Sequence, residues 1–545
     1  MRETDPRSIA GKLPAPDRHV PLVVVGAGAA GISAAIEAAR AGVEVVLIDE
    51  HPVDNDMMAM DVPLCFGQRM DGSVRNRALM LERVVETNPE LASAHEAGVD
   101  VQLGTYVWGA FVNGPAVQEV PVPMLGLADD RHSWLLGYDR LIVAAGARDV
   151  LLGFPGWERA GTLGAGGATA LLTRYRALAA RRLIVLGSSA LGLQTAELVL
   201  ENGAEVAGIV EVEAEVRGDA AAAKRLAARG VPFFTSHTIR AAHGRTGEIE
   251  SVVLVGVNRD GTPVAGSERE IQCDAVCWAI GLVPSVELLH LVGARLRFVS
   301  ELGGWVPEVN ARMRTSVPTV FAAGDCAGFH EGMLAAPEVA RAEGRAAGRA
   351  AAESLGAVRR VETETRPRVI APAPAAGETH RHWRAWLGSL MAAGGWEVNV
   401  CQCEEVTRRE LVETKPPRYL KWTSPQMSAR SVTTLLRDGP LNQDQIKRLT
   451  RAGMGPCQSR RCREQVGLLL AQAANTTLDR IPLPTFRPPI RPLPLNVLWP
   501  ADEPAAMREE WVSWFGIPTQ FSPHWTAGMA IDEPTAHVRL IMSDE

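Results

Sequence analysis

Residues 22–50 constrain the fold of this chain more strongly than any other stretch. A short apolar run ends in a glycine-rich turn, a helical segment of small residues follows, and a second apolar run closes on Asp49 and Glu50. This order of strand, turn, helix and strand is typical of a unit that holds the pyrophosphate of a dinucleotide at the positive end of its helix. The alternative is a buried helix that is merely rich in Gly and Ala. We therefore predict a parallel α/β domain with a nucleotide site here.

The three glycines of this turn have separate expected roles. Gly26 permits a tight turn, Gly28 lets backbone N–H groups approach a pyrophosphate, and Gly31 lets the helix lie close to the strand. Asp49 follows Gly31 by 18 residues and is the expected acceptor for the hydroxyls of a ribose, with Glu50 as the alternative. The candidate residues of this first nucleotide site are Gly26, Gly28, Ala29, Ala30, Gly31, Asp49 and Glu50.

A second unit of the same kind begins at Arg182, about 160 residues further along the chain. Ser189 stands where the middle glycine of its turn should be, and the added Cβ and hydroxyl crowd the place where a pyrophosphate must approach. The strand after the helix ends at Glu211, which suits NAD rather than NADP. A vestigial fold, or one that holds another nucleotide such as ATP, is favoured over a working NAD(P) site. The candidate residues are Gly187, Ser188, Ser189, Gly192 and Glu211.

Two further apolar strands end in small residues or in an acid. Residues 138–146 end in Ala145 and Gly146, so that the backbone can cross close to a flavin or nucleotide, and residues 319–325 end in Gly324 and Asp325 before a helix expected over 334–355. These motifs, in this order, resemble the two-dinucleotide-domain flavoproteins that include the glutathione-reductase-like enzymes. The resemblance implies FAD as cofactor, with Asp325 holding its ribityl chain.

Four of the eight cysteines are bunched late in the chain, as Cys401-x-Cys403 and, after 53 intervening residues, Cys457-x4-Cys462. Four thiolates suit either a tetrahedral zinc ion or a [2Fe–2S] cluster. The one-residue spacing is less usual for structural zinc, and the glycines before Cys457 leave backbone N–H groups free to point at sulfur. The pattern favours [2Fe–2S], with zinc and metal-free cysteines as the alternatives.

This part of the chain resembles the small cysteine-rich module of bacterioferritin-associated ferredoxin. The chain resembles more closely the large (alpha) subunits of opine oxidase, hydrogen cyanide synthase and dye-linked proline or hydroxyproline dehydrogenases. The resemblance rests on Cys-x-Cys-Glu-Glu-Val-Thr, Gly-Pro-Cys-Gln-x-Arg-x-Cys, Phe154-Pro-Gly-Trp157 and Leu302-Gly-Gly-Trp-Val-Pro307. The resemblance covers about residues 20–495. Residues 54–68 lack the Gly-Gly-Gln that this family usually has, and residues 415–438 are an apparent insertion.

This resemblance implies an electron-transferring subunit of a hetero-oligomeric dehydrogenase or oxidase that acts on a secondary amine or amino acid. Its expected partners are a smaller amine-oxidising flavoprotein subunit (beta) and a small ferredoxin-like subunit, and some relatives hold FMN at a subunit interface. A self-sufficient NAD(P)H-dependent flavin and iron–sulfur reductase is the alternative, against which Ser189 counts. A non-redox assembly subunit is the alternative of another class, against which the intact first motif and Asp325 count.

The expected fold class is α/β: a Rossmann-like FAD domain split by a second nucleotide-binding-like domain, then a small α-rich [2Fe–2S] domain and an extended tail. The expected boundaries are 1–18 (flexible tail), 19–155 (FAD domain, first part), 156–275 (second nucleotide domain), 276–355 (FAD domain, second part), 356–380 (linker), 381–480 ([2Fe–2S] domain) and 481–545 (extended tail).

Several functions are excluded by what the sequence lacks. A net charge of −7 argues against nucleic acid as a partner. The charged N-terminus is not a secretory signal, and no apolar run is long enough for a bilayer, so we expect a cytoplasmic protein, or one held at the inner membrane only through its electron acceptor.

The cysteines outside the late group argue against a disulfide reductase. Cys65 stands alone, and Cys273, Cys277 and Cys326 are expected to be buried packing residues rather than a redox pair. We expect His330 and Glu331 to be exposed loop residues, and no proton-transfer residue is identified.

Overall fold

The computed structural model describes residues 8, 10, 14–53, 69–114, 117–245, 247–334, 336–357, 377–418, 424–494 and 497. The described residues up to Leu493 belong to one compact unit. The loop 54–68 with Cys65, most of the expected linker 356–380 and most of the expected tail 481–545 lie outside the described residues.

The first sheet is built around β1, the first strand of the glycine-rich unit. Its strands follow the order β3-β2-β1-β6-β5-β4, and β19 pairs with β6. β1, β2, β3, β6 and β19 are mutually parallel, whereas β4, β5 and β6 form an antiparallel meander. The strands are β1 (Arg18–Val25), β2 (Val45–Asp49), β3 (Asp100–Leu103), β4 (Tyr106–Phe111), β5 (Met124–Ala128), β6 (Ser133–Val143) and β19 (Val320–Ala322).

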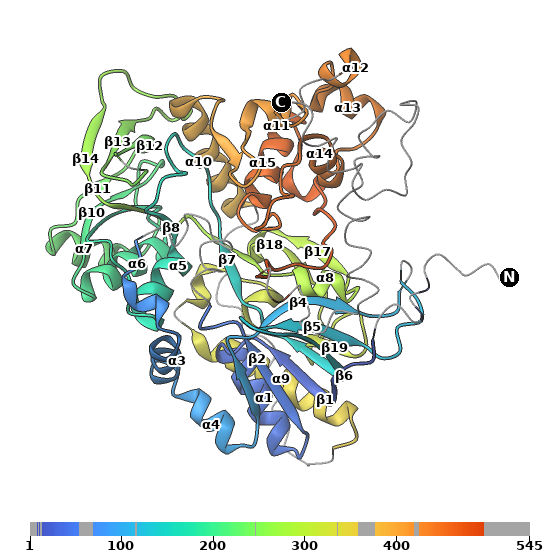
Figure 1. The fold of residues 1–545 in the computed structure, drawn as a ribbon. Coiled ribbons are helices and arrows are strands. Elements are labelled where there is room, and N and C mark those ends of the chain that lie inside the picture. The colour runs from blue at the N-terminus through green and yellow to red at the C-terminus, as the bar shows by residue number, and fades with distance from the viewer. Residues whose placement is uncertain are drawn as a thin grey trace, which may run out of the picture. The chain divides into compact units, whose positions relative to one another are not determined.

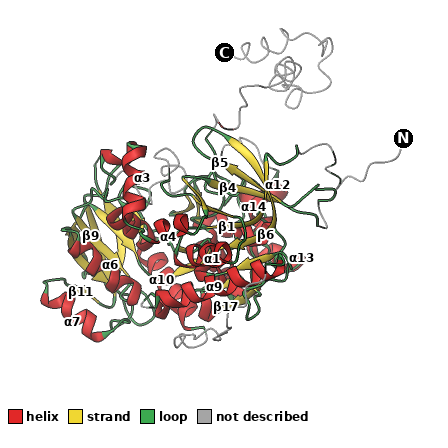
Figure 2. Ribbon diagram, turned by 90° about the horizontal axis from the view of Figure 1, so that it is seen from below, coloured by secondary structure: helices red, strands yellow, loops and turns green. Residues whose placement is uncertain are grey.

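Small residues let two helices lie side by side against this sheet (Figures 1 and 2). These are α1 (Ala29–Arg40) and α9 (Pro337–Ser354). A Cβ added at Gly344 would lie 2.0 Å from the Ala30 carbonyl oxygen, and one added at Gly348 would lie 2.3 Å from that of Ala34. The helix expected over 334–355 therefore exists and begins at Pro337. The stretch 75–97 carries two helices, α3 (Arg77–Glu86) and α4 (Glu90–Glu96).

A second, fully parallel sheet has the order β11-β10-β9-β15-β8. The predicted return to the FAD domain at residue 276 falls inside β15, which pairs with β8 and β9, so this boundary is a few residues early. The elements of this domain are β8 (Thr162–Gly164), α5 (Ala165–Thr169), β9 (Arg182–Leu186), α6 (Ala190–Glu201), β10 (Glu205–Val210), α7 (Ala220–Ala228), β11 (Phe233–Phe234) and β15 (Ala275–Trp278), with an antiparallel sheet of β12 (His237–His243), β13 (Ser251–Gly256) and β14 (Arg269–Gln272).

The chain leaves and re-enters the first domain along one antiparallel strand pair. β7 (Ala147–Asp149) pairs with β16 (Leu282–Pro284), and then α8 (Glu287–Leu291), β17 (Leu296–Val299) and β18 (Gly304–Pro307) follow. The two crossings therefore lie next to each other, as an inserted domain requires.

Residues 377–480, which we call the cysteine module, are mainly helical. The module consists of α10 (Glu378–Gly394), β20 (Asn399–Cys401), β21 (Val406–Thr407), α11 (Arg408–Val412), α12 (Pro425–Ser428), α13 (Val432–Asp438), α14 (Gln443–Thr450) and α15 (Arg463–Ala473). The apolar residues of the module belong to the same buried cluster as those of β9 and β15. The cysteine module and the second sheet therefore have a common core. The predicted α/β class is confirmed.

Candidate functional site

A cavity of about 480 Å³ brings the first glycine-rich turn together with distant segments of the chain. The ends of β1 and β2 line it, and so do the loop after β6, Asp325 after β19, and two arginines of the cysteine module. The sequence-predicted residues on its wall are Gly26, Gly28, Asp49, Glu50, Ala145, Gly146 and Asp325. Ala30, on α1, is buried at the contact with α9 instead.

The three glycines of the turn differ in what surrounds them. Gly26 has φ +106°, and an added Cβ would lie 2.2 Å from the carbonyl oxygen of Ala144. A Cβ at Gly31 would lie 1.8 Å from the carbonyl oxygen of Gly26, whereas one at Gly28 would meet nothing within 4 Å. Gly26 and Gly31 thus allow close backbone packing, and the open side of Gly28 faces the cavity at the start of α1. This cradle fits a phosphate group.

The two acids after β2 have different partners. The carboxylate of Asp49 accepts hydrogen bonds from the backbone N–H of Ala27 (2.5 Å) and of His51 (2.8 Å). Glu50 instead forms an ion pair with Arg491, whose Nε lies 2.7 Å from Glu50 Oε2. Asp49 therefore also stabilises the conformation of the turn, whereas Glu50 is paired with a residue far along the chain.

Asp325 lines the cavity directly after a turn at Gly324 that follows β19. Gly324, at φ +74°, donates its N–H to Oε2 of the buried Glu343 at 2.9 Å. Cys326 is fully buried, and its thiol lies 3.2 Å from the carbonyl oxygen of Val143. The expectation that Cys326 is a packing residue agrees with this position.

A buried set of charges lies beside this cavity, where the first domain meets the cysteine module. Glu287 of α8 forms ion pairs with Arg148 (2.7 Å) and with Arg463 (2.8 Å), and Arg463 also pairs with Glu464 at 2.6 Å. Burial alone would raise the pKa of Glu287, but the charges of Arg148 and Arg463 bring it down to about 2. Sequence reasoning missed this set, because no local pattern links its members.

The four late cysteines come from two segments that meet. Cys401 ends β20 and Cys403 lies on the turn between β20 and β21, and Cys457 and Cys462 lie in the loop before α15. A hydrogen bond with Cys462 lowers the pKa of Cys401, and one with Cys457 raises that of Cys403. The sulfurs thus form two cross-segment pairs.

The surroundings of these thiols suit sulfur anions. The N–H of Gly453 points to Sγ of Cys401 at 3.4 Å, and a Cβ at Gly455 would lie 2.2 Å from that of Cys403. Within the described residues, no three His, Cys, Asp or Glu side chains are arranged as a metal site. The four thiols and the N–H donor of Gly453 are the kinds of group that a four-thiolate centre uses, so the fit rests on residue chemistry and not on a preformed metal geometry.

The second glycine-rich turn keeps the geometry of the first. Gly187 has φ +107°, and a Cβ at Gly192 would lie 2.0 Å from the Gly187 carbonyl oxygen. Ser189, at the start of α6, is 5% exposed, and Glu211 is 1% exposed. The carboxylate of Glu211 accepts hydrogen bonds from the backbone N–H of Ser188 at 3.0 Å and from its hydroxyl at 2.8 Å.

One sequence expectation near this turn is wrong. His330 is not an exposed loop residue but is 4% exposed, and Glu331 reaches across to the start of α6. Both line a second cavity of about 260 Å³. The segment after Asp325 folds inward, because Phe329 donates its N–H to the carbonyl oxygen of Leu302.

Comparison with known families decides the assignment of the chain. The model of the pyridine nucleotide-disulphide oxidoreductase family matches residues 20–347. The chain belongs to this family. It is a flavin-dependent oxidoreductase, and the family supports FAD as the group of the first motif. Within the described residues, Cys273 and Cys277 are buried in or beside the second sheet, away from the cavity wall.

Curated relatives match almost the whole length of the chain. An opine oxidase subunit of Agrobacterium tumefaciens is 24% identical, covering 88% of this chain and 91% of that protein. The hydrogen cyanide synthase subunit HcnB of Pseudomonas aeruginosa is 25% identical, covering 87% and 97%. The solved structure of L-proline dehydrogenase from P. horikoshii aligns with a TM-score of 0.57 at 19% identity, covering 90% of this chain and 81% of that one. The chain is thus similar over most of its length to subunits of opine oxidase and of hydrogen cyanide synthase.

None of the helices within the described residues is both long and apolar enough to cross a membrane.

Proposed function

We propose that this chain is the electron-relaying subunit of a multi-subunit enzyme that oxidises a secondary amine or amino acid of the opine, proline or hydroxyproline type. One observation carries the proposal. Arg461, which lies between Cys457 and Cys462, lines the cavity of the first nucleotide site and also donates a hydrogen bond to the side-chain oxygen of Gln402, between Cys401 and Cys403. A single side chain thus spans the distance between the flavin cavity and the cysteine pairs.

The cysteine module is held rigidly at this position. Trp157 donates its indole N–H to the carbonyl oxygen of Asn399 at 2.9 Å, and the guanidinium of Arg461 lies 5.3 Å from the centre of the Trp157 ring. The fully buried Arg408 donates to the carbonyl oxygens of Gly153 and Gly395. These bonds fix how far the thiols lie from the cavity, which is what a relay between two centres requires.

The groups at the two sites are assigned from the residues that would hold them. Gly26, Gly28, Asp49 and Asp325 would hold FAD, and Cys401, Cys403, Cys457 and Cys462 would hold a [2Fe–2S] cluster. When bound, FAD carries one or two electrons and the cluster carries one, so the pair can couple a two-electron oxidation to a one-electron carrier. Arg460 and Arg461, between Cys457 and Cys462 in the sequence, would offset the negative charge of the cluster, whereas the charge of Arg463 is already shared with Glu287 and Glu464.

A partner subunit is supported by the names of the relatives, which are subunits of opine oxidase and of hydrogen cyanide synthase. We place amine oxidation on a smaller flavoprotein subunit (beta), with a small ferredoxin-like subunit as a further partner and FMN at a subunit interface. Electrons would then reach this chain from its partner in the cytoplasm or at the inner face of the membrane.

Cys457→Ser tests the cluster. We expect the variant to keep its flavin and to lose the EPR signal that the wild-type chain gives on anaerobic reduction with dithionite, because one of four thiolate ligands is gone. The measurement combines flavin absorbance, iron content per chain and EPR. Cys273→Ser is the matched control, because Cys273 is equally buried and lies outside the module.

Two outcomes would contradict the proposal. A reduced wild-type chain with zinc in place of iron and no EPR signal would make the module structural. A colourless chain that binds no flavin after reconstitution would favour an assembly role.

A further inference from the structure

We propose that the second nucleotide fold is closed to NAD(P)H by the chain's own side chains and serves instead as the docking platform of the cysteine module. The contacts that carry this inference involve neither the flavin cavity nor the four cysteines, so it stands apart from the relay function. Both ends of the expected dinucleotide site are occupied. Glu331 occupies the pyrophosphate end, and at the ribose end Glu211 faces His382 of α10.

The pyrophosphate end is taken by a carboxylate. At the first turn of α6, the backbone N–H of Ala190 donates to Oε2 of Glu331 at 3.0 Å. A pyrophosphate would need this same N–H and the positive end of the helix. Burial raises the pKa of Glu331. In its ionised form Glu331 satisfies the helix end and repels a second anion there.

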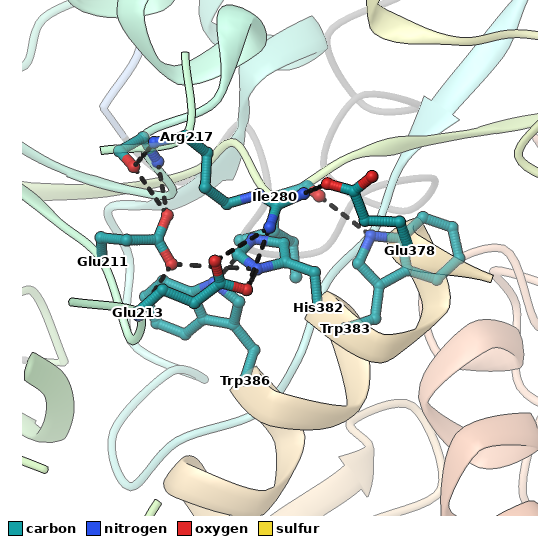
Figure 3. Close-up of polar contacts among 9 residues, drawn as sticks. Glu211, Glu213, Arg217, Ile280, Glu378, His382, Trp383 and Trp386 are labelled. Atoms are coloured by element: carbon teal, nitrogen blue, oxygen red, sulfur yellow. Dashed lines mark hydrogen bonds and ion pairs between the residues drawn. The ribbon is translucent and has the colours of Figure 1, made fainter. Parts of the chain in front are cut away.

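The ribose end is also occupied. Glu211, the acid expected to accept the ribose hydroxyls, is almost fully buried and already accepts both hydrogen bonds that Ser188 donates. His382 of α10 faces it, with Nδ1 3.9 Å from Glu211 Oε1 and 3.3 Å from Glu213 Oε1 (Figure 3). A ribose could reach Glu211 only if α10 moved away.

Two tryptophans fix α10 at this place (Figure 3). Trp383 donates its indole N–H to the carbonyl oxygen of Ile280 at 2.9 Å, and a Cβ at Gly281 would lie 2.7 Å from that indole nitrogen. Trp386 meets Trp278 of β15 edge to face, with ring centres 5.7 Å apart. Both indoles are almost completely buried, so withdrawal of α10 would expose a large apolar area.

Arg217 adds ion pairs to the contact between α10 and the second nucleotide fold. Its guanidinium forms ion pairs with Glu213, on the segment after β10, and with Glu378, in the first turn of α10, each at 3.0 Å (Figure 3). A basic side chain that could attract a phosphate is therefore already bound to two carboxylates.

The cavity that remains at the second turn is smaller than the one at the first turn. The cavity next to Ser189 and Glu331 has about 260 Å³, against about 480 Å³ at the first turn. The second fold thus keeps its glycine-rich turn, while the Glu331 carboxylate and the side chains of α10 occupy the space where a ligand would bind. Electrons would then not enter the chain from a nicotinamide nucleotide at the second fold.

The first test uses the full flavin-loaded chain and NADH or NADPH under anaerobic conditions. We expect no bleaching of the flavin and no nucleotide retained in equilibrium dialysis at millimolar concentration, while dithionite bleaches the same sample. Stoichiometric bleaching or saturable binding by either nucleotide would overturn the proposal. The dithionite and EPR response reports separately on the relay function.

The second test removes the carboxylate at the helix end. We expect Glu331→Ala to bind inorganic pyrophosphate about tenfold more tightly than the wild-type chain, because a like charge leaves the N–H of Ala190. Glu301→Ala is the matched control, because Glu301 lines the same cavity from the turn before β18. Glu331→Gln removes only the charge and should act in the same direction if the alanine variant misfolds. Equal affinities in the wild-type, Glu331 and Glu301 chains would show that Glu331 does not close the site.

Discussion

Gly28→Val is expected to abolish flavin binding while the chain keeps its fold. An added Cβ at Gly28 meets nothing within 4 Å, and φ there is −79°, so the protein itself accepts a side chain. The branched side chain would project into the cavity at the start of α1, where the phosphate of FAD must approach the backbone. The measurement is flavin absorbance per chain after reconstitution, with circular dichroism to check the fold.

The control for this variant is Gly72→Val. Gly72 is exposed, a Cβ there also has open space, and it lies away from the cavity, so full flavin content is expected. Gly26→Val should behave differently from both, because its Cβ would lie 2.2 Å from the Ala144 carbonyl oxygen and the chain should misfold. If Gly28→Val retained wild-type flavin content, the first turn would not be the flavin site.

The parts of the fold that sequence could predict are those with a local signature. The first unit has one in its glycine spacing, and Asp325 has one in the small residues before it. The parallel part of the first sheet follows from these signatures, because β1, β2 and β19 must be parallel for their ends to meet at one site, whereas the antiparallel strands β4 and β5 carry no such signature. The two cysteine pairs likewise pointed to a shared module.

Long-range contacts could not be predicted in this way. Arg491 reaches Glu50 across more than four hundred residues, and nothing in its proline-rich surroundings marks it. Glu331 looked like a loop residue because its burial depends on α6 and α10, which lie far from it in sequence. The boundary at residue 276 failed for the same reason: a short apolar strand carries no sign of which sheet it joins.

Glu287→Gln is expected to destabilise the chain by about 3–5 kcal/mol, because removal of one partner leaves buried guanidinium groups without their carboxylate. Arg148 and Arg463 both pair with this one side chain, and all three are at most 13% exposed. Glutamine keeps the shape but not the charge. The measurement is the urea midpoint of the flavin-saturated chain at neutral pH. Glu308→Gln is the control, because Glu308 pairs with Arg295 on the surface, where such a pair is worth about 1 kcal/mol or less.

The pH dependence of stability separates the charge of Glu287 from its packing. Its pKa of about 2 in the folded chain lies below the ordinary value of 4.5, so the folded state binds fewer protons between these values than the unfolded state. The stabilisation is complete above pH 4.5 and is lost as the pH falls toward 2, by about 3 kcal/mol in total. We expect this loss of folding free energy between pH 4.5 and pH 2 to be absent in Glu287→Gln and present in Glu308→Gln. If the two variants lost stability in parallel with the wild-type chain, the buried ion pairs would not be what joins the first domain to the cysteine module.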